Sequence, residues 1–113
     1  MDKPLGARVE KRGDRPCLLI NGRVVNPLFY GLTDCPGSRW SWEEVPARNI
    51  QIFTENGVSL FQVDIWLEQL VDEADRLDLS LMRRQIEGVT SIVPEAGVMI
   101  RLHLNAPDWW CYK

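Results

Sequence analysis

The sequence lacks the features that mark most metal-binding, disulfide-rich and nucleic-acid-binding proteins. One histidine and three cysteines occur in 113 residues, and Cys17, Cys35 and Cys111 form no Cys-x-x-Cys pair. This spacing predicts free thiols and neither a disulfide framework nor a zinc site, so we expect no metal and no cofactor. The net charge of −3, without any cluster of Lys or Arg, argues against a nucleic-acid partner.

Long hydrophobic runs are also missing. None approaches the ~20 residues that cross a bilayer, and residues 1–15 are too polar for a secretory signal. We therefore expect no membrane partner. Either the protein is cytoplasmic, which we favour, or this sequence is not that of the full precursor. No glycine-rich phosphate loop follows the first predicted parallel strand, which argues against a doubly wound nucleotide-binding domain.

What the sequence does contain is the pattern of one small α/β domain. Residues 1–26 are predicted to form an antiparallel hairpin appendage, with turns at Gly13-Asp14 and Asn21-Gly22. Residues 27–113 predict strands at 28–32, 59–65 and 98–105, and helices at 43–56 and about 79–93, the second ended by Pro94. The order β-α-β-α-β, with connections of this length, indicates parallel pairing.

The third predicted strand carries the most information about the fold. Its apolar residues alternate with polar ones, and Arg101 and His103 would point the same way as Gln62 and Asp64 on the second strand. Burying so many polar groups under a helix layer is costly unless each is paired, whereas this face lines the mouth of a (β/α)8 barrel. We therefore predict a partial (β/α)8 (TIM) barrel, because three strands cannot close a barrel of about eight.

Aromatic residues follow each predicted strand. All five tryptophans are expected in loops at the carboxyl ends of parallel strands, where such folds bind ligands, and none in a helix: Trp40, Trp42, Trp66, Trp109 and Trp110. Flat rings beside hydrogen-bonding groups suit carbohydrate. The alternative is that the rings cap the core and bond the backbone through their N–H groups.

Polar residues near the same strand ends are the other candidate ligand contacts. Asp64 and Arg101 are predicted to pair across adjacent strands, either to orient sugar hydroxyls or as an internal salt bridge. His103 is expected to make hydrogen bonds and not to catalyse, since no second histidine or nucleophile pattern accompanies it. Asn105 could bind ligand or cap the loop. Glycoside hydrolysis usually takes two facing carboxyl groups, and we predict no catalytic residue because the sequence offers no such pair.

These segments resemble the start of a (β/α)8 glycoside hydrolase, and are most similar to β-galactosidase-like members such as family 42. The resemblance covers roughly residues 17–110 and rests on INGR at 20–23, ENGV at 55–58, FQVDI at 61–65, LDLS at 77–80, AGVMIRLHL at 96–104 and APDWW at 106–110.

The resemblance implies a retaining hydrolase whose acid/base glutamate follows strand four and whose nucleophilic glutamate follows strand seven. Neither has a matching position here. It therefore implies an N-terminal part of a barrel that contributes sugar-binding residues for a galactoside-like substrate. By position these are Asp64, Arg101, His103 and Asn105, with Trp66, Trp109 and Trp110 matching only as aromatic loop residues.

A second hypothesis is a stand-alone, non-catalytic carbohydrate-binding or interaction domain. An Asn-Glu motif after a fourth strand, downstream of Lys113, would favour the hydrolase. A stop codon with a cooperatively folding monomer would favour the binding domain. The sequence predicts no oligomeric state.

The missing carboxylate pair gives the first prediction. The purified 113-residue chain should not hydrolyse aryl-glycosides, as followed by release of the coloured aglycone. Turnover that survives purification and disappears on mutating Asp64 would contradict it.

Overall fold

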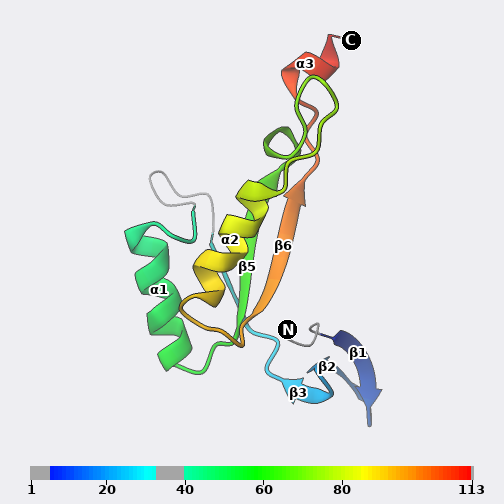
Figure 1. The fold of residues 1–113 in the computed structure, drawn as a ribbon. Coiled ribbons are helices and arrows are strands. Elements are labelled where there is room, and N and C mark those ends of the chain that lie inside the picture. The colour runs from blue at the N-terminus through cyan, green and yellow to red at the C-terminus, as the bar shows by residue number, and fades with distance from the viewer. Residues whose placement is uncertain (1–5, 33–39, 113) are drawn as a thin grey trace.

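The computed structural model describes residues 6–32 and 40–112, which form two separate three-stranded sheets (Figure 1). Cys35 and most of the loop expected at 33–42 lie outside the described residues. The molecule is elongated, with the antiparallel sheet near the amino ends of the parallel strands and the C-terminal segment beyond their carboxyl ends.

The antiparallel sheet contains β1 (Ala7–Arg12), β2 (Arg15–Ile20) and β3 (Arg23–Val25), paired in that order. Both predicted turns are present. Gly13, Asn21 and Gly22 have φ of 61°, 49° and 80°, the left-handed conformation that Gly and Asn tolerate best. The Asn21 side chain also accepts a hydrogen bond from the Gly6 amide at 2.8 Å, which ties the second turn to the beginning of β1.

The second sheet is parallel, as predicted, with β5 in its centre. β4 (Phe29–Gly31) and β6 (Gly97–His103) both pair in parallel with β5 (Leu60–Trp66). The connections contain α1 (Glu44–Glu55) and α2 (Ser80–Thr90), so the predicted order β-α-β-α-β is confirmed. Asp78 accepts hydrogen bonds from the amide and hydroxyl of Ser80, which satisfies a free N–H group where α2 begins.

Both helices cover one face of this sheet. Ile50 of α1 and Val89 of α2 pack in a single buried cluster with Phe61 and Val63, which are alternate residues of β5. The intervening residues Gln62, Asp64 and Trp66 therefore point to the opposite face. Two helices on the same face agree with successive right-handed crossovers between neighbouring strands.

The prediction that all five tryptophans lie in loops is wrong for three of them. Trp66 is the last residue of β5, and Trp109 and Trp110 lie in the short helix α3 (Asp108–Cys111). Asp108 lies in the first turn of α3, where a carboxylate interacts favourably with the positive end of the helix. A 3₁₀ turn, η1 (Leu67–Gln69), follows Trp66.

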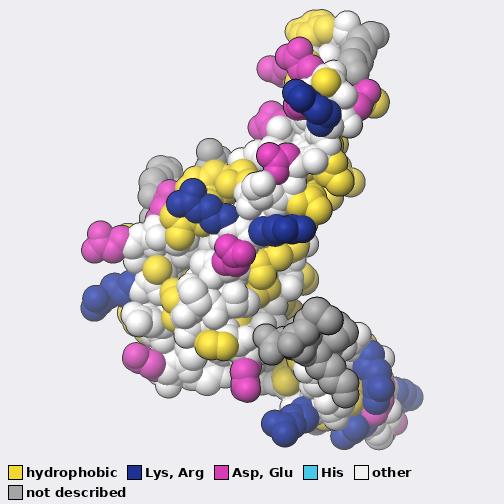
Figure 2. All heavy atoms as spheres, viewed as in Figure 1, with side chains coloured by type: hydrophobic (Ala, Val, Ile, Leu, Met, Phe, Trp, Pro, Cys, Tyr) yellow, Lys and Arg dark blue, Asp and Glu magenta, His cyan; other side chains and the backbone are white. Residues whose placement is uncertain are grey.

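The described part of β6 pairs with β5 on one side only, and both of its faces remain partly bare. Met99 and Leu102, on opposite faces, are each 43% exposed, and Leu104 just beyond the strand is 70% exposed. Figure 2 shows hydrophobic side chains along this strand. Across residues 6–32 and 40–112, no helix has the length and apolar character needed to cross a membrane.

The core cluster predicts a contrast between two isoleucines of α1. Ile50→Ala should lower the free energy of unfolding by about 2–5 kcal/mol, because Ile50 is fully buried and its loss leaves a cavity. Ile52→Ala is the matched control, since Ile52 is 44% exposed. Urea denaturation of the two variants measures the difference, and equal destabilisation would contradict this packing.

Candidate functional site

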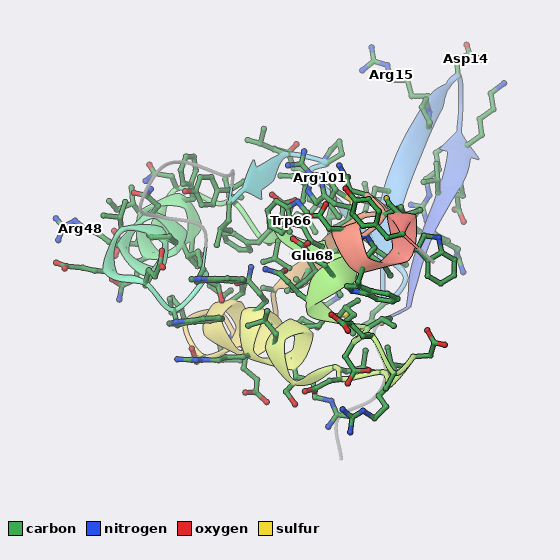
Figure 3. The ribbon with its side chains drawn as sticks, turned by 90° about the horizontal axis from the view of Figure 1, so that it is seen from above. Asp14, Arg15, Arg48, Trp66, Glu68 and Arg101 are labelled. Carbon is green, nitrogen blue, oxygen red and sulfur yellow. The ribbon has the colours of Figure 1, made fainter. Side chains whose placement is uncertain are left out.

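The candidate site is a cluster of four side chains on the sheet face away from the two helices. The register of the parallel pair places Asp64 of β5 beside Arg101 of β6, and Trp66 beside His103. Seen from above, Trp66 and Arg101 lie on the side of the sheet away from α2 (Figure 3). These four residues are called the Asp64 cluster below.

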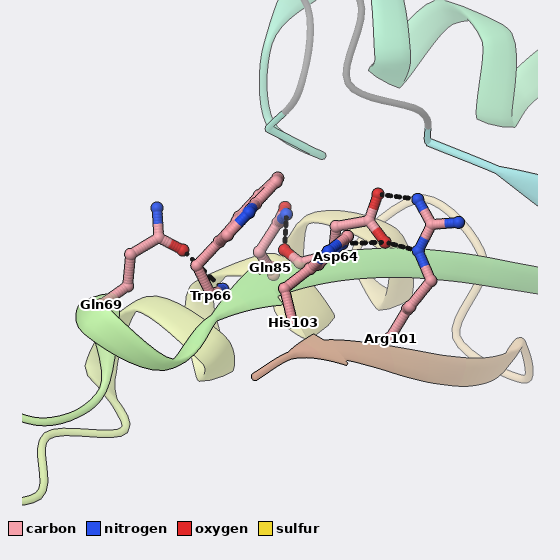
Figure 4. Close-up of polar contacts among 6 residues, drawn as sticks. All are labelled: Asp64, Trp66, Gln69, Gln85, Arg101 and His103. Carbon is pink, nitrogen blue, oxygen red and sulfur yellow. Dashed lines mark hydrogen bonds and ion pairs between the residues drawn. The ribbon is translucent and has the colours of Figure 1, made fainter. Parts of the chain in front are cut away.

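The ion pair predicted between Asp64 and Arg101 is present and bidentate. Arg101 Nε lies 2.7 Å from Asp64 Oδ1, and the Nη2 atom lies 3.0 Å from Oδ2 (Figure 4). Asp64 is 2% exposed, whereas the Arg101 side chain is 48% exposed. Hydrogen bonding to Asp64, together with its negative charge, raises the pKa of Arg101. The fork geometry fixes both planar groups and leaves one side of the guanidinium toward solvent.

His103 lies between the carboxylate and the Trp66 ring. The Nε2 atom of His103 is 3.5 Å from Asp64 Oδ1, longer than an ordinary hydrogen bond. That buried nitrogen has no hydrogen-bond partner among the described residues. The imidazole stacks on the Trp66 indole, with ring centroids 4.4 Å apart and an angle of 8° between planes. The backbone N–H of Trp66 donates to Gln69 Oε1 at 3.0 Å, which ties the end of β5 to η1.

The Asp64 cluster combines unused hydrogen-bond donors with an aromatic ring. A guanidinium has five N–H donors, of which Asp64 takes two in the fork. The remaining donors of Arg101 lie on its half-exposed side and can bind ligand oxygens. Within the cluster Asp64 is the one carboxylate, and both its oxygens are held by Arg101. The cluster can therefore orient a polar ligand, but it does not contain the two carboxyl groups that glycoside hydrolysis takes.

The other predicted site residues lie beyond β6. Asn105 is exposed in the segment between β6 and α3. Trp109 and Trp110 form an edge-to-face pair with centroids 5.9 Å apart. Together with Leu67, Leu104 and Pro107 they line an apolar pocket of about 360 Å³. This pocket adjoins the end of β5, because Leu67 directly follows Trp66.

A buried polar contact behind β5 was not predicted from the sequence. Gln85 of α2 is fully buried, and its Nε2 atom donates to the backbone oxygen of Asp64 at 3.1 Å. The Oε1 atom of Gln85 accepts from the Ser41 amide at 2.8 Å. The detectable signal was a polar residue inside the helical stripe of Met82, Ile86 and Val89. Its partner, 44 positions away, has no local signature.

Trp40 and Trp42 form a third aromatic group, beside Ser41. Their rings stack with centroids 5.2 Å apart and an angle of 6° between planes. The guanidinium carbon of Arg84 lies 4.0 Å from the centroid of the Trp42 ring. Since that ring contacts both a cation and a second indole, its surroundings fit a structural role for Trp42.

The buried carboxylate of Asp64 predicts a loss of stability when its charge is removed. Asp64→Asn should lower the free energy of unfolding by about 2 kcal/mol, because the side chain at this buried position loses its charge-assisted hydrogen bonds with Arg101. Asp14→Asn, in the exposed turn between β1 and β2, is the control and should leave stability nearly unchanged. Thermal unfolding followed by circular dichroism compares the two, and a Tm for Asp64→Asn at or above that of the wild type would contradict the prediction.

Comparison of the chain with protein-family models, with curated proteins and with solved structures gives no match.

Proposed function

We propose that the chain is the N-terminal part of a retaining, β-galactosidase-like glycoside hydrolase with a (β/α)8 barrel. In this proposal Asp64, Trp66, Arg101 and His103 bind the sugar of a galactoside-like substrate, and the catalytic carboxylates lie outside this chain. Asn105, Trp109 and Trp110 would form the outer part of the same binding region.

The observation that supports the proposal most strongly is the placement of the Asp64 cluster. It occupies the sheet face opposite α1 and α2, and it includes a buried carboxylate, a half-exposed guanidinium and an indole. In a (β/α)8 barrel the helices surround the sheet and the opposite face turns inward, toward the mouth where substrates bind. An open sheet with a helix layer on that face would have to bury the guanidinium of Arg101.

The chemistry of the cluster favours a sugar over an anionic or apolar ligand. The negative charge of Asp64 balances the positive charge of Arg101, so the pair offers hydrogen-bond donors without a net charge. One face of the Trp66 ring is occupied by His103. The remainder of the ring is partly exposed. Hydroxyl groups and an apolar ring face complement this arrangement.

The bare faces of β6 support continuation of the barrel. Leu102 points to the same face as the core residues Phe61 and Val63 but is 43% exposed. A further strand beside β6, with a helix following it, would cover Leu102 and Leu104. The proposal therefore accounts for apolar exposure at the end of the sheet.

Sugar titration of the 113-residue chain tests the proposed function. Methyl β-galactoside should change the tryptophan fluorescence, and Arg101→Gln should raise the Kd roughly tenfold, which corresponds to about 1.4 kcal/mol. Arg83→Gln is the matched control, because Arg83 is exposed on α2, and it should bind as the wild type does.

The proposal fails if the folded wild-type chain shows no galactoside binding, or if both arginine variants lose affinity equally. Far-ultraviolet circular dichroism of each variant confirms that the titrated sample is folded.

A further inference from the structure

Gln85 connects two parts of the chain that the proposed binding site needs in fixed positions. The side chain leaves α2, is fully buried, and reaches the backbone of β5 at Asp64 (Figure 4). On its other side it contacts Ser41, which is also fully buried and lies between Trp40 and Trp42. One amide group thus contacts both the strand that carries the carboxylate and a segment rich in aromatic residues.

The contact with β5 is made to a backbone oxygen of this central strand. Leu32, just after β4, donates its amide to the backbone oxygen of Gln62 at 2.9 Å. In a parallel ladder the next oxygen of β5 that points toward β4 belongs to Asp64, two residues further on. Nε2 of Gln85 donates to this oxygen at 3.1 Å. The amide of Gln85 therefore satisfies a buried acceptor at the residue whose side chain holds Arg101.

The contact with Ser41 is double and sterically tight. The Ser41 amide donates to Gln85 Oε1 at 2.8 Å, and the Ser41 hydroxyl donates to the Gln85 backbone oxygen at 2.7 Å. One turn later, a Cβ atom at Gly88 would overlap Ser41 Oγ and lie 2.8 Å from Ser41 Cβ. Glycine at position 88 thus permits Ser41 to lie directly against α2.

The same turn of α2 also contacts an aromatic ring on one side of Ser41. Arg84 lies over Trp42, which stacks on Trp40. Arg84, Gln85 and Gly88 together fix the segment from Trp40 to Trp42. Of these three, Gln85 is the residue that also bonds β5.

We propose that Gln85 is a positioning residue that holds Asp64 and the Trp40–Trp42 segment in one fixed arrangement. The part of this proposal that concerns ligand affinity rests on the proposed function. Any displacement of the segment is transmitted through the amide to the backbone of Asp64, and from there to the orientation of Arg101 toward a ligand. Loss of the amide should then change both the environment of the two tryptophans and sugar affinity.

The test uses the two hydrogen bonds of the Gln85 side chain, in which Nε2 donates to Asp64 and Oε1 accepts from Ser41. Gln85→Met keeps the volume and removes both hydrogen bonds. It should alter the near-ultraviolet circular dichroism of the tryptophans and raise the Kd for methyl β-galactoside roughly threefold or more. In Gln85→Glu the introduced carboxyl can donate to the Asp64 oxygen only when it is protonated. Because position 85 is fully buried, desolvation should raise the pKa of this carboxyl above the ~4.3 of a free glutamate, so wild-type behaviour should return as the pH is lowered from about 8 to about 5.

Two controls isolate this effect. Gln51→Glu introduces the same charge at an exposed position of α1 and should follow the wild type at every pH. Because Asp64 and His103 are present in every variant, each measurement is compared with the wild type at the same pH. Ser41→Ala removes the bond from Ser41 Oγ alone, and it replaces Gln85→Met if that variant does not fold; it should alter the same tryptophan signal.

The outcomes separate this proposal from the proposed function. If the wild type binds no sugar, the proposed function fails, and the circular dichroism of the Gln85 variants still tests the arrangement. An unchanged tryptophan signal in Gln85→Met, or the absence of recovery at low pH in Gln85→Glu, overturns the positioning role. A changed signal with unchanged affinity in a chain that binds sugar also overturns it, because Gln85 would then support the fold alone.

Discussion

The arrangement of the parallel sheet depends on the burial of one carboxylate. Asp64 is 2% exposed in the central strand, and an unpaired charge there would be strongly unfavourable. Arg101 supplies two hydrogen bonds from the neighbouring strand, and His103 lies beside the same oxygen. Because these partners come from β6, the buried carboxylate requires this particular strand as its neighbour.

The two faces of β5 therefore have different surroundings. Phe61 and Val63 contact α1 and α2 and contribute the apolar burial that stabilises the domain. Gln62, Asp64 and Trp66 face the other way, where polar groups remain near solvent. The backbone of the same strand is bonded from behind by Gln85. Because the core residues and the residues of the proposed site lie on opposite faces, β5 can contribute to both.

Much of this arrangement could be predicted from the sequence, because it follows local periodicity. Alternation along 59–65 and 98–105 located β5 and β6 to within one or two residues, and the shared direction of Asp64 and Arg101 predicted their ion pair. The turns of the antiparallel sheet followed from Gly13 and Asn21-Gly22. Errors arose where a short segment has competing signals: Asp108 favours the start of a helix in a segment that Pro107 predicts to be a loop.

Contacts between distant segments could not be predicted in the same way. The bonds between Gln85 and Ser41 depend on how α2 packs against the segment before α1, and Gly88 has a reason only once that packing is known. Likewise, the alternation pattern of three strands does not by itself distinguish an open sheet from a barrel, because about eight strands are needed to close a barrel. The local alternation of apolar and polar residues predicts the strands and the direction in which their side chains point. The residues of α2 that contact the back of β5 depend on tertiary packing.

The bidentate ion pair between Asp64 and Arg101 also has a consequence for the register in which β6 pairs with β5. Sliding β6 by two residues along β5 would preserve which side chains face the helices, so the apolar pattern alone does not forbid it. Such a shift would bring Met99 or His103 opposite Asp64 in place of Arg101. The methionine has no donor for a buried carboxylate, and the imidazole cannot match the two-pronged contact. The ion pair thus favours the observed register of β5 and β6 over registers shifted by two residues, which the apolar pattern does not distinguish.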